Sequence, residues 1–180
     1  MIVAQAEPTH AVHRPSLEES LNFISGIDFS MTIKKLSMPS PTLARTWTSL
    51  SARLAIAQYR RFLWLLRKQC DEPDSHLVPS PEIDEMWHHH ILDTRSYQRD
   101  CQGIFGSFQH HFPYFGTRGP EDEMALQREF VKTRELYAAE FGEDIWVIPE
   151  SLDDDAITIQ DDVEIAFPHE FRLRVKAARA

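Results

Sequence analysis

The sequence is poor in cysteine and glycine, and it lacks a long hydrophobic run. Its two cysteines, Cys70 and Cys101, are too few for a disulfide framework, so we expect free thiols and a cytoplasmic protein. The six glycines form no glycine-rich phosphate loop and no GxSxG nucleophile elbow. No apolar run approaches the roughly 20 residues of a membrane span. Residues 1–15 show no basic region followed by an apolar one, so we expect no secretory signal.

Positive charge is also scarce, because 19 lysines and arginines stand against 28 aspartates and glutamates. The net charge of −9 and the pI of about 5.4 argue against general nucleic-acid binding and against adhesion to anionic membranes, since both need a basic face. We therefore expect the partner to be a small molecule or another protein.

Large packing side chains are abundant, with 42% hydrophobic residues that include 11 phenylalanines and four tryptophans. A chain of 180 residues with this content can bury a sizeable core in one domain. We predict a mainly α fold, in which a compact multi-helix domain covers 15–149 and follows a flexible N-terminus over 1–14. An acidic linker and a small β-like C-terminal extension are expected over 150–180.

Capping signals set the expected helix boundaries. Ser16 and Glu19 form a capping-box pattern, and two Ser-Pro pairs combine a capping side chain with a proline at the first helical position. The expected helices run from 16 to about 26, from 41 to 70, from Pro81 through WHHH, from Asp93-Thr94 to Pro113, and from 120 to 141. Beyond 150, apolar and polar residues alternate, which predicts a hairpin around Asp161-Asp162. A lone hairpin is marginal in water, so it must pack on the helices, pair with a partner or stay loose.

Two histidine clusters, WHHH at 87–90 and HH at 110–111, carry the strongest chemical signal. Neutral imidazole binds zinc, iron and copper, and thiolate or carboxylate can complete the shell. The available groups are Asp84, Glu85, His88, His89, His90, Asp93, Cys101, His110 and His111. Residues two apart on an α-helix point about 200° apart, so His88 and His90 cannot bind one ion from a regular helix.

Two arrangements remain open. In the first, His88 pairs with Asp84 four residues earlier, and the carboxylate binds the ion or orients the ring. In the second, the helix frays near His90, which turns toward the next helix, where Cys101 and His111 lie near one stripe. An ion between the two helices would then collect ligands from both clusters.

A structural interpretation competes with the metal hypothesis. Histidines beside Trp87 can simply form hydrogen bonds to Asp84 or to a backbone carbonyl, and Cys101 and Tyr97 resemble core residues. The aromatic-rich stretch HFPYFG is interpreted first as a loop over the core and second as the wall of a ligand site.

The stretch EIDEMWHHHILDTRSYQRDCQGIFGSFQHHFPYFG resembles the signature of the glycine-rich domain-containing-protein-like family, in its bacterial form. The matching positions are Asp84, Trp87, His88, His90, Tyr97, Asp100, Cys101, Phe105-Gly106 and His110-His111, and the resemblance spans roughly 40–142. It implies a mostly helical domain but no settled reaction. The family's variable position falls on His89, which we leave out. The glycine-rich tail is absent, so its RNA-related roles are not transferred.

We therefore expect a cytoplasmic metal-binding helical protein, which would be a metalloenzyme if the site is catalytic. The candidate ligands are His88, His90, His110 and His111, followed by Cys101. Asp84 would orient a histidine, and Tyr97 would be a nearby proton donor. Zinc is the first expectation and non-haem iron the second. The rival hypothesis is a non-catalytic interaction module in which the same motif specifies helix packing.

Overall fold

The computed structural model describes residues 14–39, 47–72 and 76–148. These residues form six α-helices and no strand, which confirms the predicted mainly α fold. The helices are α1 (Leu17–Gly26), α2 (Ser30–Leu36), α3 (Ser49–Gln69), α4 (Pro81–Leu92), α5 (Thr94–Phe105) and α6 (Pro120–Phe141). No helix among the described residues is both long enough and apolar enough to span a membrane. The predicted N-terminal segment and the β-like extension lie outside the described residues.

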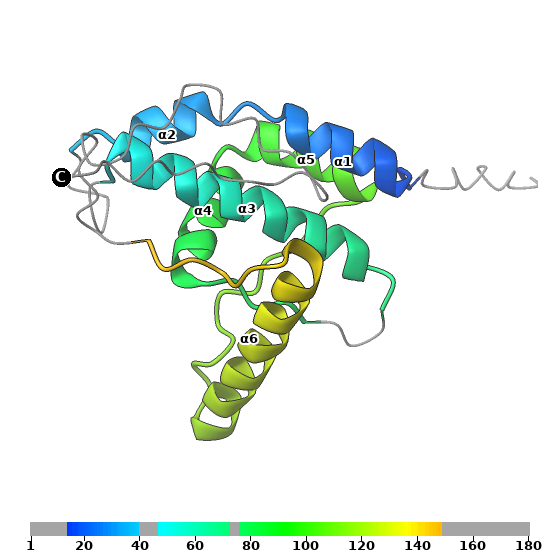
Figure 1. Cartoon of the computed structure of the whole chain (residues 1–180), viewed down its shortest axis with the longest axis vertical. Helices are drawn as coiled ribbons and strands as arrows, with labels where there is room; N and C mark the ends of the chain where they lie inside the picture. The colour runs from blue at the N-terminus through cyan, green and yellow to red at the C-terminus, as the bar shows by residue number, and fades with distance from the viewer. Residues whose placement is uncertain (1–13, 40–46, 73–75, 149–180) are drawn as a thin grey trace, which may run out of the picture.

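Helix α3 is the centre of the fold, because it contacts α1, α2, α4 and α6 (Figure 1). Its side chains are buried around most of the helix, including Ala52, Tyr59, Phe62 and Leu63. A helix that is buried on several faces must be surrounded by other elements. Four helices therefore surround α3, while α5 packs on α1 and α4.

The start of α3 differs from the sequence prediction. The helix begins at Ser49, and the Thr48 side chain accepts a hydrogen bond from the Ser51 backbone N–H at 3.1 Å. The predicted start at residue 41 lies outside the described residues, and Trp47 precedes the helix. Its indole instead donates to Glu85 of α4 at 2.9 Å. Thr48 was missed because the Ser-Pro pair upstream is the more conspicuous capping signal.

Helices α4 and α5 are joined through Asp93, which ends the first and caps the second. Helix α5 ends at Phe105, and the predicted continuation to Pro113 is wrong. Gly106 has a φ of 71°, the left-handed conformation that ends helices, and its N–H donates to the Gln102 carbonyl at 3.1 Å. Residues 106–119 therefore form a loop that carries the second histidine pair.

Helix α6 has the predicted bounds, and its N-terminal half projects away from the bundle (Figure 1). Its C-terminal half packs on α3 around Arg61, whose side chain is only 1% exposed. The Arg61 guanidinium donates to the Tyr137 hydroxyl at 3.0 Å and to Glu143 at 2.7 Å. It also lies over the rings of Phe141 and Trp146, at 4.8 and 5.3 Å. This contact fixes one end of α6 and leaves the other end free to form a wall.

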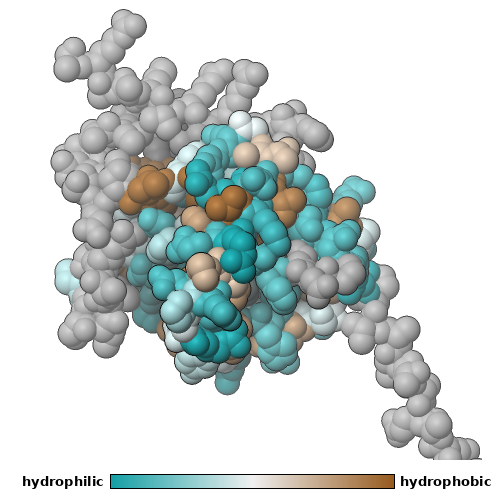
Figure 2. All heavy atoms as spheres, turned by 90° about the horizontal axis from the view of Figure 1, so that it is seen from below, coloured by the Kyte–Doolittle hydropathy of each residue, from teal (hydrophilic) through white to brown (hydrophobic). Residues whose placement is uncertain are grey.

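The surface around the projecting end of α6 is mainly hydrophilic. Figure 2 shows this side of the molecule, on which hydrophobic residues appear as small separate patches among hydrophilic ones. Scattered apolar residues of this kind are normal on a folded protein. A functional site near the projecting end of α6 would therefore depend on individual side chains rather than on one broad apolar surface.

Candidate metal site and adjoining cavity

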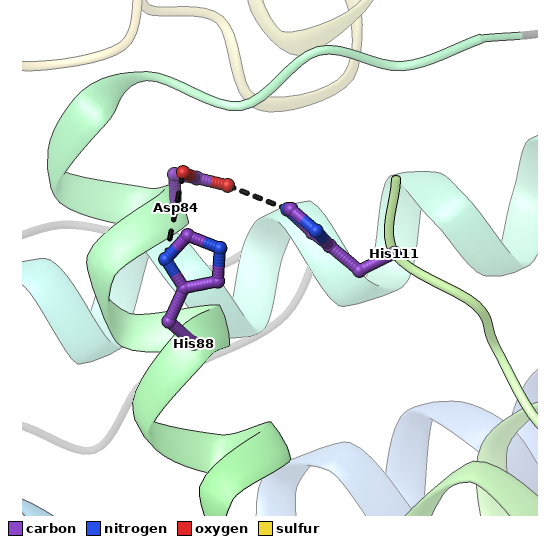
Figure 3. A group of neighbouring side chains, drawn as sticks. All are labelled: Asp84, His88 and His111. Atoms are coloured by element: carbon purple, nitrogen blue, oxygen red, sulfur yellow. Dashed lines mark hydrogen bonds and ion pairs between the residues drawn. The ribbon is translucent and has the colours of Figure 1, made fainter. Parts of the chain in front are cut away.

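Asp84, His88 and His111 converge at one point, where their potential ligand atoms all lie within 4.8 Å of one another (Figure 3). The His111 Nε2 lies 2.8 Å from one carboxylate oxygen of Asp84, and the His88 Nδ1 lies 3.8 Å from the other. The centroids of the two imidazole rings are 4.7 Å apart. Two distant stretches of chain thus bring two imidazoles and one carboxylate together.

Helix α4 presents Asp84 and His88 on the same side, because residues four apart lie about one turn apart. The helix starts as predicted, with the Ser80 side chain accepting from the Ile83 N–H at 3.4 Å and Pro81 at the first position. Ile83 and Trp87 are buried in the core. Their neighbours in sequence therefore lie at the edge of the buried face, where Asp84 is partly exposed and His88 is half-exposed.

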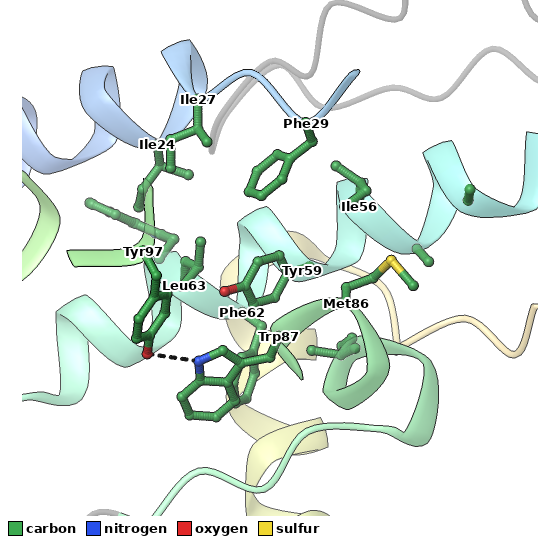
Figure 4. Close-up of a cluster of buried hydrophobic side chains, with 14 of the residues drawn as sticks. Ile24, Ile27, Phe29, Ile56, Tyr59, Phe62, Leu63, Met86, Trp87 and Tyr97 are labelled. Atoms are coloured by element: carbon green, nitrogen blue, oxygen red, sulfur yellow. Dashed lines mark hydrogen bonds between the residues drawn. The ribbon is translucent and has the colours of Figure 1, made fainter. Parts of the chain in front are cut away.

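The loop that carries His111 is anchored by Tyr97. The Tyr97 hydroxyl accepts from the Trp87 indole N–H at 2.9 Å (Figure 4). It donates to the Gln109 carbonyl at 2.5 Å. Burial raises the pKa of Tyr97, so the hydroxyl remains a donor. The His111 ring stands edge-on to Trp87, with centroids 4.5 Å apart. Tyr97 therefore lies in the core, outside the three converging residues, and acts on the position of the loop.

His90 lies apart from this point, inside the core at 4% exposure. Its Nδ1 lies 2.9 Å from the Tyr59 hydroxyl, and its Nε2 lies 3.0 Å from Asp100, which also accepts from Arg99 at 2.8 Å. Burial acts to raise the pKa of Asp100, but the hydrogen bonds from His90 and Arg99 outweigh it and lower the pKa. Asp100 is thus a carboxylate, and the His90 Nε2 carries the proton that it accepts.

Both ring nitrogens of His90 are therefore engaged. Burial raises the pKa of Tyr59, so its hydroxyl stays protonated and pairs with the Nδ1 of His90, as donor to a neutral ring or as acceptor from a protonated one. No lone pair of the ring is left for a metal. The fraying of α4 near His90, which the second sequence arrangement required, does not occur because the helix continues to Leu92.

Cys101 and His110 are also outside the converging group. Cys101 is 2% exposed, and burial raises the pKa of its thiol, as expected of a small core residue. His110 is exposed, and its ring packs against Phe108, with centroids 4.9 Å apart. Of the predicted ligands, the structure thus brings His88 and His111 together with Asp84. The Asp84–His88 pair belongs to the first sequence arrangement, and the approach of His111 from the other cluster belongs to the second.

A cavity of about 770 Å³ adjoins Asp84 and His111. Trp87 also lines the cavity, and α6 contributes a wall through Leu126 and Phe130. Phe112, Pro113 and Phe115 also line it, so the HFPYFG stretch forms a cavity wall, the second of its two sequence interpretations. The α6 wall was missed because helical periodicity indicates which residues face a core but not which helix end projects past it.

Arg118 is a further charged residue of the lining that sequence reasoning missed. Its guanidinium pairs with Asp122 at 2.6 Å and lies over the Phe112 ring at 5.2 Å. Asp122 also accepts from the Gly116 N–H at 2.7 Å, which ties the loop to α6. The only available sequence signal was the (i, i+4) spacing of the ion pair.

One family model, named UCP032817-like, matches residues 20–136, which is more than half of the chain. No curated protein and no solved structure matches the chain significantly. The resemblance to the glycine-rich domain-containing-protein-like family is therefore wrong, because the family model that matches is a different one. The name of the matching family states no activity, so any reaction must be argued from the site. The chain belongs to the UCP032817-like family.

Proposed function

We propose that Asp84, His88 and His111 bind one divalent transition-metal ion, which acts on a molecule in the adjoining cavity. The observation that carries the proposal is the convergence of these three side chains from α4 and the loop after α5. Two imidazoles and one carboxylate are the ligand set of several catalytic zinc sites and of non-haem iron sites, which retain open coordination positions. Zinc is the first choice and iron the second.

The distances among the three side chains indicate that only a small rearrangement of them is needed to bind a metal ion. Ligands about 2.0–2.1 Å from a tetrahedral zinc ion lie about 3.4 Å from one another. The separations from the Asp84 carboxylate, 2.8 Å to His111 and 3.8 Å to His88, bracket that value. The half-exposed His88 provides a route by which the ion enters, while Asp84 and His111 face the cavity. A metal held in this way supplies Lewis-acid chemistry at its open position.

The experiment is metal analysis of protein purified without a histidine tag, stripped with chelator and then titrated with zinc or iron(II). We expect one ion per chain in the wild type and none in the double variant His88→Ala, His111→Ala. Asp84→Asn tests the carboxylate while preserving its shape. The matched control is His110→Ala, which removes an adjacent imidazole outside the group and should retain the metal. Equal metal in the wild type and the double variant would overturn the proposal.

The rival function, a non-catalytic interaction module, rests on a different observation. Phe108, Phe112 and Tyr114 are 49%, 56% and 63% exposed on one loop, where a protein partner could cover them. Under this function, zinc leaves the melting temperature unchanged, because nothing binds the folded state preferentially. Deletion of 151–180 or substitution of the three aromatic residues would then abolish capture of a partner. A rise in melting temperature with zinc favours the metal site.

A further inference from the structure

We propose that the cavity binds a small monocarboxylate with an apolar, ring-sized body, whose carboxylate reaches the metal held by Asp84 and His111. This inference rests on the proposed metal site. It goes beyond that site by assigning the chemical class of the ligand from the size, lining and charge of the cavity.

The size of the cavity favours a small organic molecule. Its volume of about 770 Å³ falls within the range of about 300–1,000 Å³ that is typical of small-molecule sites. The cavity is bounded by α3, α4 and α6, by the loop after α5 and by the stretch 76–79. Gly116 brings the loop close to α6, because a Cβ atom there would stand 2.6 Å from the Leu126 side chain. The loop and α6 are thus in contact, and the wall that they form is built by packing.

The lining favours a ligand with an apolar body. Most of its side chains are hydrophobic, and they come from five segments: α3, the stretch before α4, α4, the loop after α5, and α6. They include Leu66, Leu77, Trp87, Phe112, Leu126 and Phe130. Aromatic faces such as those of Trp87 and Phe112 pack well against a flat ring. His111 of the polar Asp84–His111 pair packs against the Trp87 ring, so one part of the ligand meets polar groups while the rest meets hydrocarbon.

The charge of the lining favours an anion once a metal is bound. The charged side chains of the lining are Asp84 and Arg118, and the charge of Arg118 is offset by its pairing with Asp122. The metal-free cavity is therefore negative at Asp84. When the imidazoles are neutral, a divalent ion bound beside the Asp84 carboxylate changes the net charge at that point from −1 to +1. Binding of a carboxylate should thus require the metal.

The test is calorimetric titration of the full chain with 3-phenylpropionate, with and without one equivalent of zinc. We expect binding to the zinc-loaded protein and none to the zinc-free protein. The amine 2-phenylethylamine, which has a similar body and the opposite charge, should not bind to the zinc-loaded protein. Binding of both compounds, or binding of 3-phenylpropionate without zinc, would overturn the assignment of a metal-directed carboxylate.

A pair of variants separates the cavity from the metal site. Gln127→Trp adds bulk to an exposed residue of the cavity wall on α6 and should weaken 3-phenylpropionate binding about tenfold or more while zinc still binds. The matched control is Arg128→Trp, on the next residue outside the lining, which should bind as the wild type does. Gln127→Phe serves if the larger substitution prevents folding. If a folded Gln127 variant binds zinc and binds 3-phenylpropionate as tightly as the wild type does, the ligand assignment alone is overturned. If the wild type binds no zinc, the proposed function is overturned.

Discussion

The molecule contains two groups of aspartate and histidine, and they differ in whether the polar atoms of their side chains already have partners within the protein. In the core, Asp100 and His90 are 1% and 4% exposed, and each nitrogen of the ring has a partner within the protein. At the cavity, Asp84 and His111 form a similar pair at 2.8 Å, but Asp84 is partly exposed and His88 stands beside them without a close hydrogen bond to the carboxylate.

The comparison shows that an aspartate–histidine pair is not by itself a sign of function. Buried polar groups need internal partners, so a core histidine is held by hydrogen bonds and has no free capacity for a ligand. A pair at a cavity keeps unused lone pairs and access from solvent. The number of nitrogen atoms already engaged therefore separates a structural histidine from a candidate ligand more sharply than the sequence motif does.

The largest expected effect comes from His90→Ala. The substitution opens a cavity in the core, leaves the Tyr59 hydroxyl without its partner and removes the buried one of the two partners of Asp100. We expect the free energy of unfolding to fall by roughly 3–5 kcal/mol, since such cavities and uncompensated buried charges cost that much. Chemical denaturation measures the change. A loss below about 1 kcal/mol would show that the core network is not the structural group described above.

Asp100→Asn should have the next largest effect, and its effect should depend on pH. The folded-state pKa of Asp100 lies below the ordinary value of 3.8, so its charged form stabilises the fold above that value. The contribution is lost as pH falls through the lower folded-state pKa. We expect the variant to lose about 1.5–3 kcal/mol at neutral pH, as for hydrogen bonds to charged groups. The difference from the wild type should shrink below pH 3.8, in denaturation curves measured from pH 7 down to pH 3. A difference that stays constant over this range would contradict the assignment of a charged Asp100.

Tyr97→Phe tests the connection between the core and the cavity. The variant leaves the Trp87 indole N–H without its acceptor and the Gln109 carbonyl without its donor. We expect a loss of about 1–3 kcal/mol in stability and a loss of about 10–100-fold in zinc affinity, because groups that orient ligands have effects of that size. Calorimetry with zinc gives the second value. The matched control is Tyr114→Phe, which removes a hydroxyl from an exposed ring and should change neither quantity. Unchanged zinc affinity in the Tyr97 variant would mean that the loop does not depend on this anchor.

Much of the fold could be predicted from local signals. The Ser16–Glu19 capping box forms with both hydrogen bonds, at 2.7 and 3.2 Å, and Gly142 ends α6 with a φ of 73°. Helix α2 was not predicted, because no side chain caps its start and its seven residues are too few to show a period. It is positioned by packing, since Leu36 is fully buried. Tertiary contacts, rather than propensity, determine a helix of this length.

The candidate site could be predicted only in part, because helical spacing relates residues within one helix. The spacing of Asp84 and His88 places them together, as the first sequence arrangement required. It could not show that His90 is the inward-facing member of WHHH, which depends on Tyr59 and Asp100 from other helices. Nor could it show the path of the loop that carries His111. Metal binding by these residues stays a prediction.

The smallest expected effect, that of His88→Ala without metal, is the most decisive for the comparison. The His88 side chain is 47% exposed, and its Nδ1 lies 3.8 Å from the carboxylate, too far for a hydrogen bond. The metal-free variant should therefore unfold within about 0.5 kcal/mol of the wild type. With zinc at 100 times its dissociation constant, the wild type should gain about 2.7 kcal/mol by mass action, and the variant should gain none. His110→Ala, the matched control, should gain as the wild type does. If His88→Ala destabilises the metal-free protein as much as His90→Ala does, then His88 has a structural role. The distinction between the core pair and the group at the cavity would then fail.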